Sequence, residues 1–412
     1  MTPERRLEEA LARLLPSPPP ARIGVAVSGG GDSAALMHLA SAWATRAGVA
    51  LEVATIDHGL RAEAAAEAAL VASGAETLGL PHETLHWRGW DGRGNLQDQA
   101  RRARYGLLTA WAQRRGLRAV LLGHTRNDNA ECVLLGLSRG AGLDGLSGMR
   151  PAFRRSGVLL VRPLLSVPRE ALRDWLLARH LHWIDDPSNE DNRFARVRAR
   201  EALDRLSALG ITAEALARSA ENLRRTREGL QEILRAEARA HCSTEAGDVI
   251  VAPGALEAMP EEIARRLLNA ALRWVACADY PPRAQNVALL MGDGEARHAG
   301  MTLHGCLVRE TPDGLRISRE PEAARRAPTA GPEDLWDGRW QVAGPFQPDM
   351  VVRDLGEAGL SQAADWRASG LPRATCLASP AVWQGETLRA APLLEPNGDF
   401  VARVVPDFFE GL

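Results

Sequence analysis

Hydrophobic and polar positions form two kinds of segment over the first two hundred residues. Short, mostly apolar runs predict strands, and the longer stretches between them, in which apolar residues recur at helical spacing, predict helices. The strands are expected at 22–28, 49–57, 81–87 and 118–124, and the helices at 33–48, 62–79 and 96–116. This alternation predicts an α/β fold with a doubly wound, mostly parallel sheet. Ligands bind beyond the carboxyl ends of the strands in such sheets, which is where Ser28, Asp57 and His124 stand.

The pattern changes near residue 208. A long helix rich in Arg and Glu is expected over 211–242, followed by a further helix and short β-like runs. The segment 321–334 is rich in Pro, Ala and Gly and has the composition of an interdomain linker. We therefore expect three domains: an α/β domain at 1–208, a connector helix with a second α+β domain at 209–325, and a small β-rich domain at 326–412.

Composition narrows the class of protein. Of the 412 residues, 45% are hydrophobic and 25% are charged, and the formal net charge is -2, which is typical of a globular protein. No stretch has the apolar length of a signal peptide or a membrane span, so we expect a cytoplasmic protein with no membrane partner. The five cysteines form no CxxC pair, which argues against a zinc site, an iron–sulfur cluster and a disulfide framework.

The chain contains 50 basic residues, and every one of them is arginine. Schiff-base chemistry, pyridoxal phosphate attachment, a covalent lysyl-adenylate and a Walker-type phosphate loop all require a lysine side chain. The sequence therefore excludes these four kinds of site.

The stretch SGGGDS joins the first predicted strand to the first predicted helix. Its glycines would let backbone N–H groups approach a phosphate closely, and the helix N-terminus adds its positive dipole end. A carboxylate in this loop would repel phosphates unless it held Mg²⁺ between them, so Asp32 is the expected metal ligand. The phosphate cradle is expected to consist of Ser28, Gly29, Gly30 and Gly31, and Asp32 and Ser33 complete the expected ATP-binding loop.

The SGGxDS pattern after a first strand resembles the PP-loop superfamily of N-type ATP pyrophosphatases. Five further motifs resemble the tRNA(Ile)-lysidine synthase family: TIDHGLR at 55–61, GNLQDQARRARYGLL at 94–108, GHTRNDNAECVLLGLSRGAGLDGLSGM at 123–149, VRPLLSVPREAL at 161–172 and WIDDPSNEDNRFARVRARE at 183–201. The resemblance implies a ligase that uses ATP to form a C–N bond. It would adenylate O2 of the wobble cytidine in a tRNA(Ile) with a CAU anticodon. The ε-amine of L-lysine would then attack C2, which gives lysidine, AMP and pyrophosphate.

The resemblance also implies roles for single residues. Besides the glycine-rich loop, the ATP-binding residues would be Asp57, His58, Gly123 and His124. His124 would act in the adenylation step, either by contacting the nucleotide or by stabilising the charge that develops at the α-phosphate. Asp128 and Glu131 would form an acidic pocket for the lysine ammonium, and one of them could accept a proton. The implied catalytic residues are Asp32, His124, Asp128, Glu131 and Arg196.

Three arginines in the last motif, Arg196, Arg198 and Arg200, would contact substrate, and the resemblance implies that at least one reaches the active site or the tRNA. In an extended segment the three side chains would project on one side and could grip phosphates. In a helix they would spread around the axis.

The sequence departs from the family pattern at four positions. Asn127 stands where the family usually has aspartate, Asn129 where glutamine is frequent, Cys132 where threonine is usual, and Val197 where many members have asparagine. Asn127 keeps a hydrogen-bonding amide and lacks the charge, so one carboxylate that could hold a metal or lysine is missing.

Two alternatives stay open. The first is another adenylating enzyme of the superfamily, although a tRNA thiolase would need paired cysteines, and NAD and GMP synthetases have no counterpart of the DDPSN…RxRxR motif. The second is an ATP- or RNA-binding protein without catalysis. The resemblance further implies that the domains at 209–325 and 326–412 bind tRNA, and the chain could assemble as a homodimer.

Overall fold

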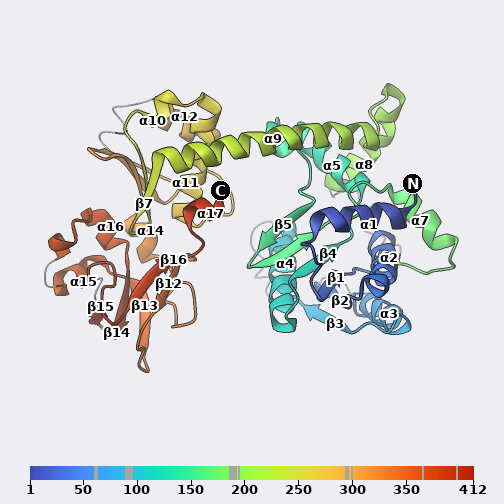
Figure 1. The fold of residues 1–412 in the computed structure, drawn as a ribbon, viewed down its shortest axis with the longest axis horizontal. Helices are drawn as coiled ribbons and strands as arrows, with labels where there is room; N and C mark the ends of the chain where they lie inside the picture. The colour runs from blue at the N-terminus through green and yellow to red at the C-terminus, as the bar shows by residue number, and fades with distance from the viewer. Residues whose placement is uncertain are drawn as a thin grey trace. The chain divides into compact units, whose positions relative to one another are not determined.

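A computed structural model describes residues 1–59, 64–88, 96–184, 193, 195–292, 297, 300–363, 366–395 and 398–412. The chain divides into two compact units, Met1–Arg227 and Glu228–Leu412. The long helix α9 (Ala213–His241) contains the boundary between them and is drawn as one continuous helix in Figure 1.

The first unit contains a sheet of six described strands in the order β3-β2-β1-β4-β6-β5. Five of these strands are parallel to one another, and β5 pairs antiparallel with β6. The elements of this unit are α1 (Pro3–Leu14), β1 (Arg22–Ala26), α2 (Gly31–Ala47), β2 (Ala50–Asp57), α3 (Ala64–Thr77), β3 (His82–His86), α4 (Leu96–Arg115), β4 (Ala119–Leu122), α5 (Arg126–Leu137), α6 (Leu143–Leu146), β5 (Ala152–Arg155), β6 (Val158–Val161), α7 (Arg169–Leu177) and α8 (Ala195–Leu206).

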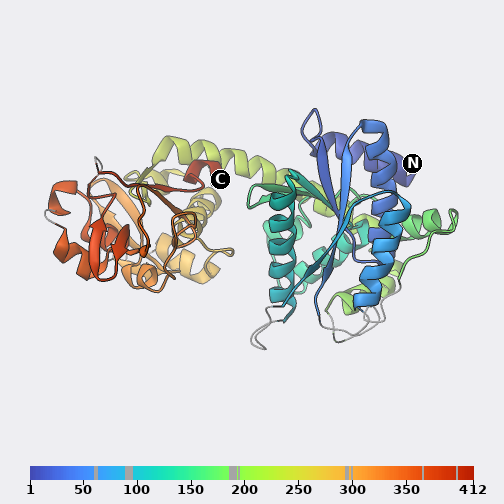
Figure 2. The ribbon, with the colours of Figure 1, turned by 90° about the horizontal axis from the view of Figure 1, so that it is seen from below.

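Helices cover both faces of this sheet, and Figure 2 shows α2 and α3 on one side and α4 on the other. Ile23 of β1 packs into one apolar core with Leu36 of α2. Leu108 and Trp111 of α4 pack into a second core on the opposite face. The central strand β4 is apolar and buried at every position because both faces are covered. The predicted α/β fold with a doubly wound, mostly parallel sheet is confirmed.

The strand order reverses between β1 and β4. The strands β2 and β3 continue the sheet on one side of β1, whereas β4 and β6 continue it on the other. The helices that follow such a pair of strands diverge, which leaves a crevice outside the carboxyl ends of the two strands. The segments that follow β1 and β4 therefore meet at the place where a ligand would bind.

The four strands and three helices predicted in this unit are present, with small shifts at their ends. The sequence pattern did not predict β5 and β6, which form a hairpin with Ser156 and Gly157 at positive φ in its turn. Each strand is only four residues long, and the residues of β5 are half-buried or exposed, so the apolar signal is weak.

The described part of the second unit contains antiparallel sheets in the orders β7-β8-β11-β10-β9, β12-β16 and β13-β14-β15. Leu234 and Ala238 of α9 pack into a core with α11. Its strands and helices are β7 (Cys242–Glu245), β8 (Asp248–Val251), α10 (Ala255–Ala258), α11 (Glu261–Ala276), α12 (Ala284–Gly292), β9 (Met301–Leu303), β10 (Cys306–Thr311), β11 (Gly314–Arg319), α14 (Pro321–Arg325), β12 (Trp340–Ala343), β13 (Met350–Asp354), α15 (Gly356–Gln362), α16 (Arg373–Leu377), β14 (Pro380–Gln384), β15 (Thr387–Ala390), β16 (Val401–Val404) and α17 (Phe408–Gly411).

The segment 321–334 is not the linker that its composition suggests. It begins with α14, and Ala330 forms a β-bridge with Val352. Ala324 and Ala330 are both buried in a core that also contains Trp336. The small side chains that resemble a linker in sequence allow this close packing. The expected domain boundaries at 1–208, 209–325 and 326–412 stay a prediction.

No helix in the described ranges is both long and apolar enough to cross a lipid bilayer. The five cysteines all lie in these ranges and are free thiols. Burial raises the pKa of Cys306 to about 12, so this thiol is unreactive near neutral pH.

Candidate active site

The loop between β1 and α2 has the geometry of a phosphate cradle. Gly29 has a φ of +90°, which side chains with a Cβ rarely adopt, and a Cβ at this position would lie 2.6 Å from Cδ1 of Ile184. Gly30 precedes α2, and no side chain caps the start of that helix. The first N–H groups of α2 are therefore directed toward any anion bound in the loop.

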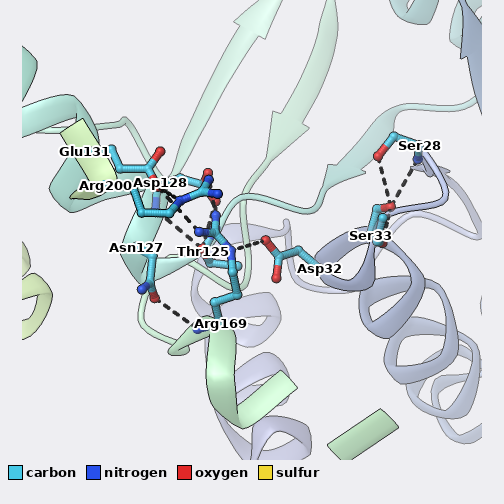
Figure 3. A network of polar contacts seen from close by, with 10 residues as sticks. Ser28, Asp32, Ser33, Thr125, Asn127, Asp128, Glu131, Arg169 and Arg200 are labelled. Atoms are coloured by element: carbon cyan, nitrogen blue, oxygen red, sulfur yellow. Dashed lines mark hydrogen bonds and ion pairs between the residues drawn. The ribbon is translucent and has the colours of Figure 1, made fainter. Parts of the chain in front are cut away.

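Ser33 fixes the shape of this loop, as Figure 3 shows. Its hydroxyl accepts a hydrogen bond from the Ser28 N–H at 3.1 Å and donates to the Gly30 carbonyl at 2.9 Å. Gly123, which follows β4, passes so close that a Cβ there would lie 3.0 Å from Cα of Ser33. The segments after β1 and β4 thus pack directly against each other.

Three carboxylates surround one guanidinium beside the loop (Figure 3). Arg169, the first residue of α7, donates from Nε to Oδ2 of Asp32 at 2.9 Å. It also donates from Nη2 to Oδ1 of Asp128 at 3.1 Å and from Nη1 to Oε1 of Glu131 at 3.4 Å. Only 15% of its side chain is exposed. These residues form a pocket for a cation, and Arg169 fills it in this structure.

Burial and the paired charges shift the pKa values of Asp32 and Arg169 in this pocket. Burial raises the pKa of Asp32, and the neighbouring Arg169 guanidinium offsets only part of this effect. Burial would lower the pKa of Arg169, but the charges of Asp128 and Asp32 outweigh burial and raise it. Arg169 therefore stays charged, and Asp32 holds a proton more readily than an exposed aspartate does.

Glu131 is the most deeply buried carboxylate of the pocket, with 2% of its side chain exposed. Its Oε1 accepts hydrogen bonds from Arg169 and from Nε of Arg200, the latter at 3.1 Å. Its Oε2 is buried and has no hydrogen-bond partner among the described residues. Such an oxygen is costly in a folded protein, which marks it as a position where a bound ligand would donate.

The start of α5 aims Asp128 into the pocket. Thr125 and Asp128 form a capping box in which Oδ2 of Asp128 accepts from the Thr125 N–H at 2.7 Å. This leaves Oδ1 of Asp128 for Arg169. Asn127 accepts from the Arg169 N–H at 3.0 Å and so satisfies the first N–H group of α7. That role requires an acceptor oxygen and no charge, which explains how an amide serves at this position.

His124 lies among guanidinium groups. Nε of Arg162 lies 3.2 Å from Nδ1 of His124. Burial, together with the charges of Arg162, Arg104 and Arg196, holds the pKa of His124 well below 6.5. The imidazole is therefore neutral at physiological pH. The site consists of an acidic half around Arg169 and a basic half around His124.

The three arginines of the last motif lie on α8, so the helical alternative is the correct one. Arg196 and Arg200 are four residues apart and share one face of the helix. Arg200 pairs with Glu131, and Arg196 contributes to the field at His124. The guanidinium of Arg198 instead donates to the Arg193 carbonyl at 2.9 Å. The structure therefore brings two of the three arginines to the site.

Asp57 and His58 lie at the carboxyl end of β2, next to the loop that follows β1. Oδ1 of Asp57 accepts from the Gly59 N–H at 2.8 Å, and Oδ2 lies 3.3 Å from Nδ1 of His86. Oδ1 thus holds the local turn, whereas Oδ2 faces the end of the neighbouring strand β3. The expected contact with a nucleotide stays a prediction. Leu60 and Arg61 of the same motif, and the DDPSN residues 185–189, lie outside the described residues.

Sequence reasoning missed Arg162 and Arg169, although both lie in the quoted motif VRPLLSVPREAL. Arg162 directly follows β6, and Arg169 directly follows Pro168 at the start of α7. Two signals were available in the sequence: one arginine follows the carboxyl end of an apolar run, and the other follows a proline that marks the start of a helix. Neither signal specifies the partner of the arginine.

A cavity of about 280 Å³ borders Glu131 on α5. It lies within the first unit, and charged groups of both signs line it. Nη1 of Arg126 lies 3.8 Å from Glu214, and Nε of Arg126 is buried without a hydrogen-bond partner among the described residues. The charged and amide side chains in the lining are Arg126, Asn127, Glu131, Glu170, Arg200, Asp204 and Glu214.

Comparison with known proteins identifies first the domain family and then the protein family of this chain. Residues 3–206 match the family described as PP-loop domain, which covers the sheet, the glycine-rich loop and the acidic pocket. A tRNA(Ile)-lysidine synthase from Ruegeria pomeroyi is 50% identical over 376 residues, or 91% of this chain and 89% of the relative. The corresponding protein of Bradyrhizobium diazoefficiens is 38% identical over 347 residues, or 78% and 95%. That of Methylobacterium nodulans is 41% identical over 312 residues, or 74% and 91%. The chain belongs to the tRNA(Ile)-lysidine synthase family.

Proposed function

We propose that this chain is an ATP-dependent ligase that joins L-lysine to the wobble cytidine of a tRNA(Ile) with a CAU anticodon. Cytidine O2 attacks the α-phosphate of ATP, the bond between the α- and β-phosphates breaks, and pyrophosphate leaves. The ε-amine of lysine then attacks C2, the C2–O2 bond breaks, and AMP leaves with the oxygen. The observation that carries this proposal is the cation pocket of Asp32, Asp128 and Glu131 beside a phosphate-binding loop.

The glycine-rich loop would hold the phosphates of ATP through backbone N–H groups and the start of α2. Asp32 and Asp128 supply the carboxylate oxygens that Mg²⁺ prefers, and both already bind a cationic group from the chain itself. Bound Mg²⁺ would neutralise phosphate charge. Asp57 and His58 would contact the nucleoside part, as the family resemblance implies.

The basic half of the site suits the adenylation step. His124 is neutral, because its pKa is held well below 6.5 by burial and by the surrounding arginines. It would donate a hydrogen bond where negative charge develops on the α-phosphate. Arg196, which lies in the same cluster, would add positive charge at that point or contact tRNA phosphate. Arg200 would act on the lysine-binding side of the site through its ion pair with Glu131. Arg198 would contact tRNA, as the family resemblance implies.

The acidic half suits the second step. A lysine ammonium has the same charge as the guanidinium that lies between the three carboxylates. Oε2 of Glu131, which has no hydrogen-bond partner among the described residues, would accept a hydrogen bond from this ammonium. It would then take one proton, which frees the nitrogen lone pair that attacks C2. Arg169 must move aside for the amine to enter. The sequence provides no competing side-chain amine, because the chain contains no lysine.

The cavity next to Glu131 suits the other end of the lysine molecule. At about 280 Å³ it lies near the lower limit for small-molecule sites. Arg126 offers donors for an α-carboxylate, and Glu170 and Asp204 offer acceptors for an α-ammonium group. The tRNA would also contact the second unit, and homodimer assembly in the cytoplasm would be compatible with this function.

Transfer of radiolabelled L-lysine to a tRNA(Ile) transcript tests the proposal. The reaction contains ATP and Mg²⁺, and a matched transcript with U in place of the wobble C is the control. We expect label on the C transcript alone. If neither transcript is labelled while ATP binds to the folded protein, the chain uses another acceptor or lacks catalysis.

A further inference from the structure

The contact between Arg162 and His124 determines which imidazole nitrogen carries the proton. Nε of an arginine can only donate, so Nδ1 of His124, at 3.2 Å, must accept. A neutral imidazole that accepts at Nδ1 carries its proton at Nε2. The ring is then a hydrogen-bond donor at Nε2 and nowhere else.

Arg162 is itself held rigidly. Its Nη1 donates to the Arg150 carbonyl at 2.6 Å, and its Nη2 donates to the Tyr105 hydroxyl at 3.0 Å. The guanidinium lies 4.6 Å from the centre of the Phe153 ring, and 5% of the residue is exposed. All three guanidinium nitrogens thus have defined partners, and the one that faces His124 cannot turn away without breaking two further hydrogen bonds.

We propose that Arg162 is a positioning residue that fixes His124 as the Nε2–H tautomer and thereby makes it a permanent donor for the adenylation step. This inference rests on the role proposed for His124. It adds a residue that does not touch the reacting atoms. An imidazole protonated at Nδ1 would turn a lone pair toward the substrate, and that tautomer cannot stabilise an oxyanion.

The charges around His124 support the same state. They come from α4, from the segment after β6 and from α8, while Cys132 on α5 lies in the same field. The groups that face the ring or this field are Arg101, Arg104, Tyr105, Cys132, Asp128, Arg162 and Arg196. Removing Arg162 would take away one of the positive charges and the hydrogen bond that Nδ1 accepts within the described part of the chain. The pKa of His124 would then rise toward 6.5, and both neutral tautomers would be populated.

Three variants test this inference in the full-length protein. Arg162→Met removes the donor, Arg162→Lys keeps a charged donor, and Arg154→Met removes a charge from the exposed side of the same hairpin as a control. In ¹⁵N-histidine spectra, with His124 assigned by a His124→Asn variant, wild-type Nδ1 should have the shift of an unprotonated nitrogen. In Arg162→Met this signal should move toward the average of the two tautomers.

Pyrophosphate release during adenylation provides the second measurement. We expect Arg162→Met to release pyrophosphate about ten- to a hundredfold more slowly at neutral pH. In its pH–rate profile, the loss of rate on the acid side should begin at higher pH than in the wild type. Arg162→Lys should recover most of the rate, and Arg154→Met should match the wild type. If Arg162→Met is too unstable, Tyr105→Phe loosens the same arginine and should shift both measurements in the same direction.

The two proposals fail separately. The role of Arg162 would be overturned if Nδ1 of His124 were protonated in the wild type. It would also be overturned if a folded Arg162→Met variant had the same pH–rate profile on the acid side as the wild type. Absence of lysine transfer in the wild type would overturn the proposed function and would leave the tautomer measurement intact.

Discussion

Nε of Arg169 lies 2.9 Å from Oδ2 of Asp32, so the first residue of α7 reaches the first turn of α2 and neutralises the carboxylate of the phosphate-binding loop. The same guanidinium also pairs with Asp128 and Glu131. The three carboxylates of the pocket are thus held together by a cation of the chain itself. This arrangement makes the stability of the pocket and its affinity for cations dependent on each other.

Replacing Arg169 with Met should leave three clustered carboxylates without their cation. We expect a loss of about 1–3 kcal/mol in the free energy of unfolding, because buried Glu131 loses a partner. Added Mg²⁺ or L-lysine should then raise the melting temperature more in the variant than in the wild type. Thermal unfolding with and without each ligand measures this shift in melting temperature. The control is Arg179→Met, which replaces an exposed arginine that pairs with Glu4. Equal ligand shifts in both proteins would show that Arg169 does not occupy the cation site.

Asp32→Asn should stabilise the protein and inactivate it. Because burial raises the pKa of Asp32, the folded protein binds this proton more tightly than the unfolded chain does. Ionised Asp32 therefore destabilises the fold fully above its raised folded-state pKa, and this effect fades as the pH falls toward the ordinary value of 3.8. We expect a higher melting temperature for Asp32→Asn at pH 7.5, and a difference that shrinks toward pH 4.

Adenylation by Asp32→Asn should fall by about a hundredfold or more, because the variant cannot hold a cation against the phosphates. Pyrophosphate release measures this loss. A variant that is less stable than the wild type at pH 7.5 would contradict the pKa direction, and a fully active variant would contradict the role of Asp32.

Arg126→Gln should weaken lysine binding and leave adenylation unchanged. Arg126 lines the cavity beside Glu131 and has a buried Nε without a partner among the described residues. The loss of one charged hydrogen bond should raise the KM for lysine about tenfold. Pyrophosphate release without lysine should stay at the wild-type rate, and Arg139→Gln, in an exposed arginine outside the cavity, is the control. An unchanged KM would place the α-carboxylate elsewhere.

At position 127 a carboxylate should replace the amide without loss, whereas removal of the side-chain acceptor should destabilise the protein. Asn127→Asp keeps the acceptor for the Arg169 N–H and adds a negative charge at the start of α7, where helix dipoles favour it. We expect this variant to retain stability and activity. Asn127→Ala removes the acceptor and should cost about 1 kcal/mol of stability, measured by denaturant unfolding. A strong activity gain in Asn127→Asp would show that the missing charge limits the reaction.

The fold of the first unit and the loop residues 28–33 could be predicted because their signals are local. Strand and helix periods, and glycines between them, depend on residues that are neighbours in the chain. The parallel order then brings Ser28 and His124 to one edge without further information. The confirmed family membership follows from the same ordered motifs.

The partners of the arginines could not be predicted, because they are set by contacts between distant segments. Arg169 and Asp32 are 137 residues apart, and Arg162 and His124 are 38 residues apart. The alternation of Arg196, Arg198 and Arg200 allowed either a strand or a helix. In the structure the segment forms α8, and the buried residues of this helix are Val197, Ala199 and Leu203. At 321–334, small residues predicted a linker, whereas their burial depends on the surrounding core.

Arg169 also bears on the fidelity of amino-acid selection. A pocket that accommodates the guanidinium of its own chain does not exclude free L-arginine by charge or by the size of the head group. In the proposed reaction, discrimination against arginine would then come from nucleophilicity, because a guanidinium keeps its proton at physiological pH and has no free lone pair with which to attack. L-Arginine would be a dead-end competitor of lysine, and the error rate would stay low even where binding is poorly selective.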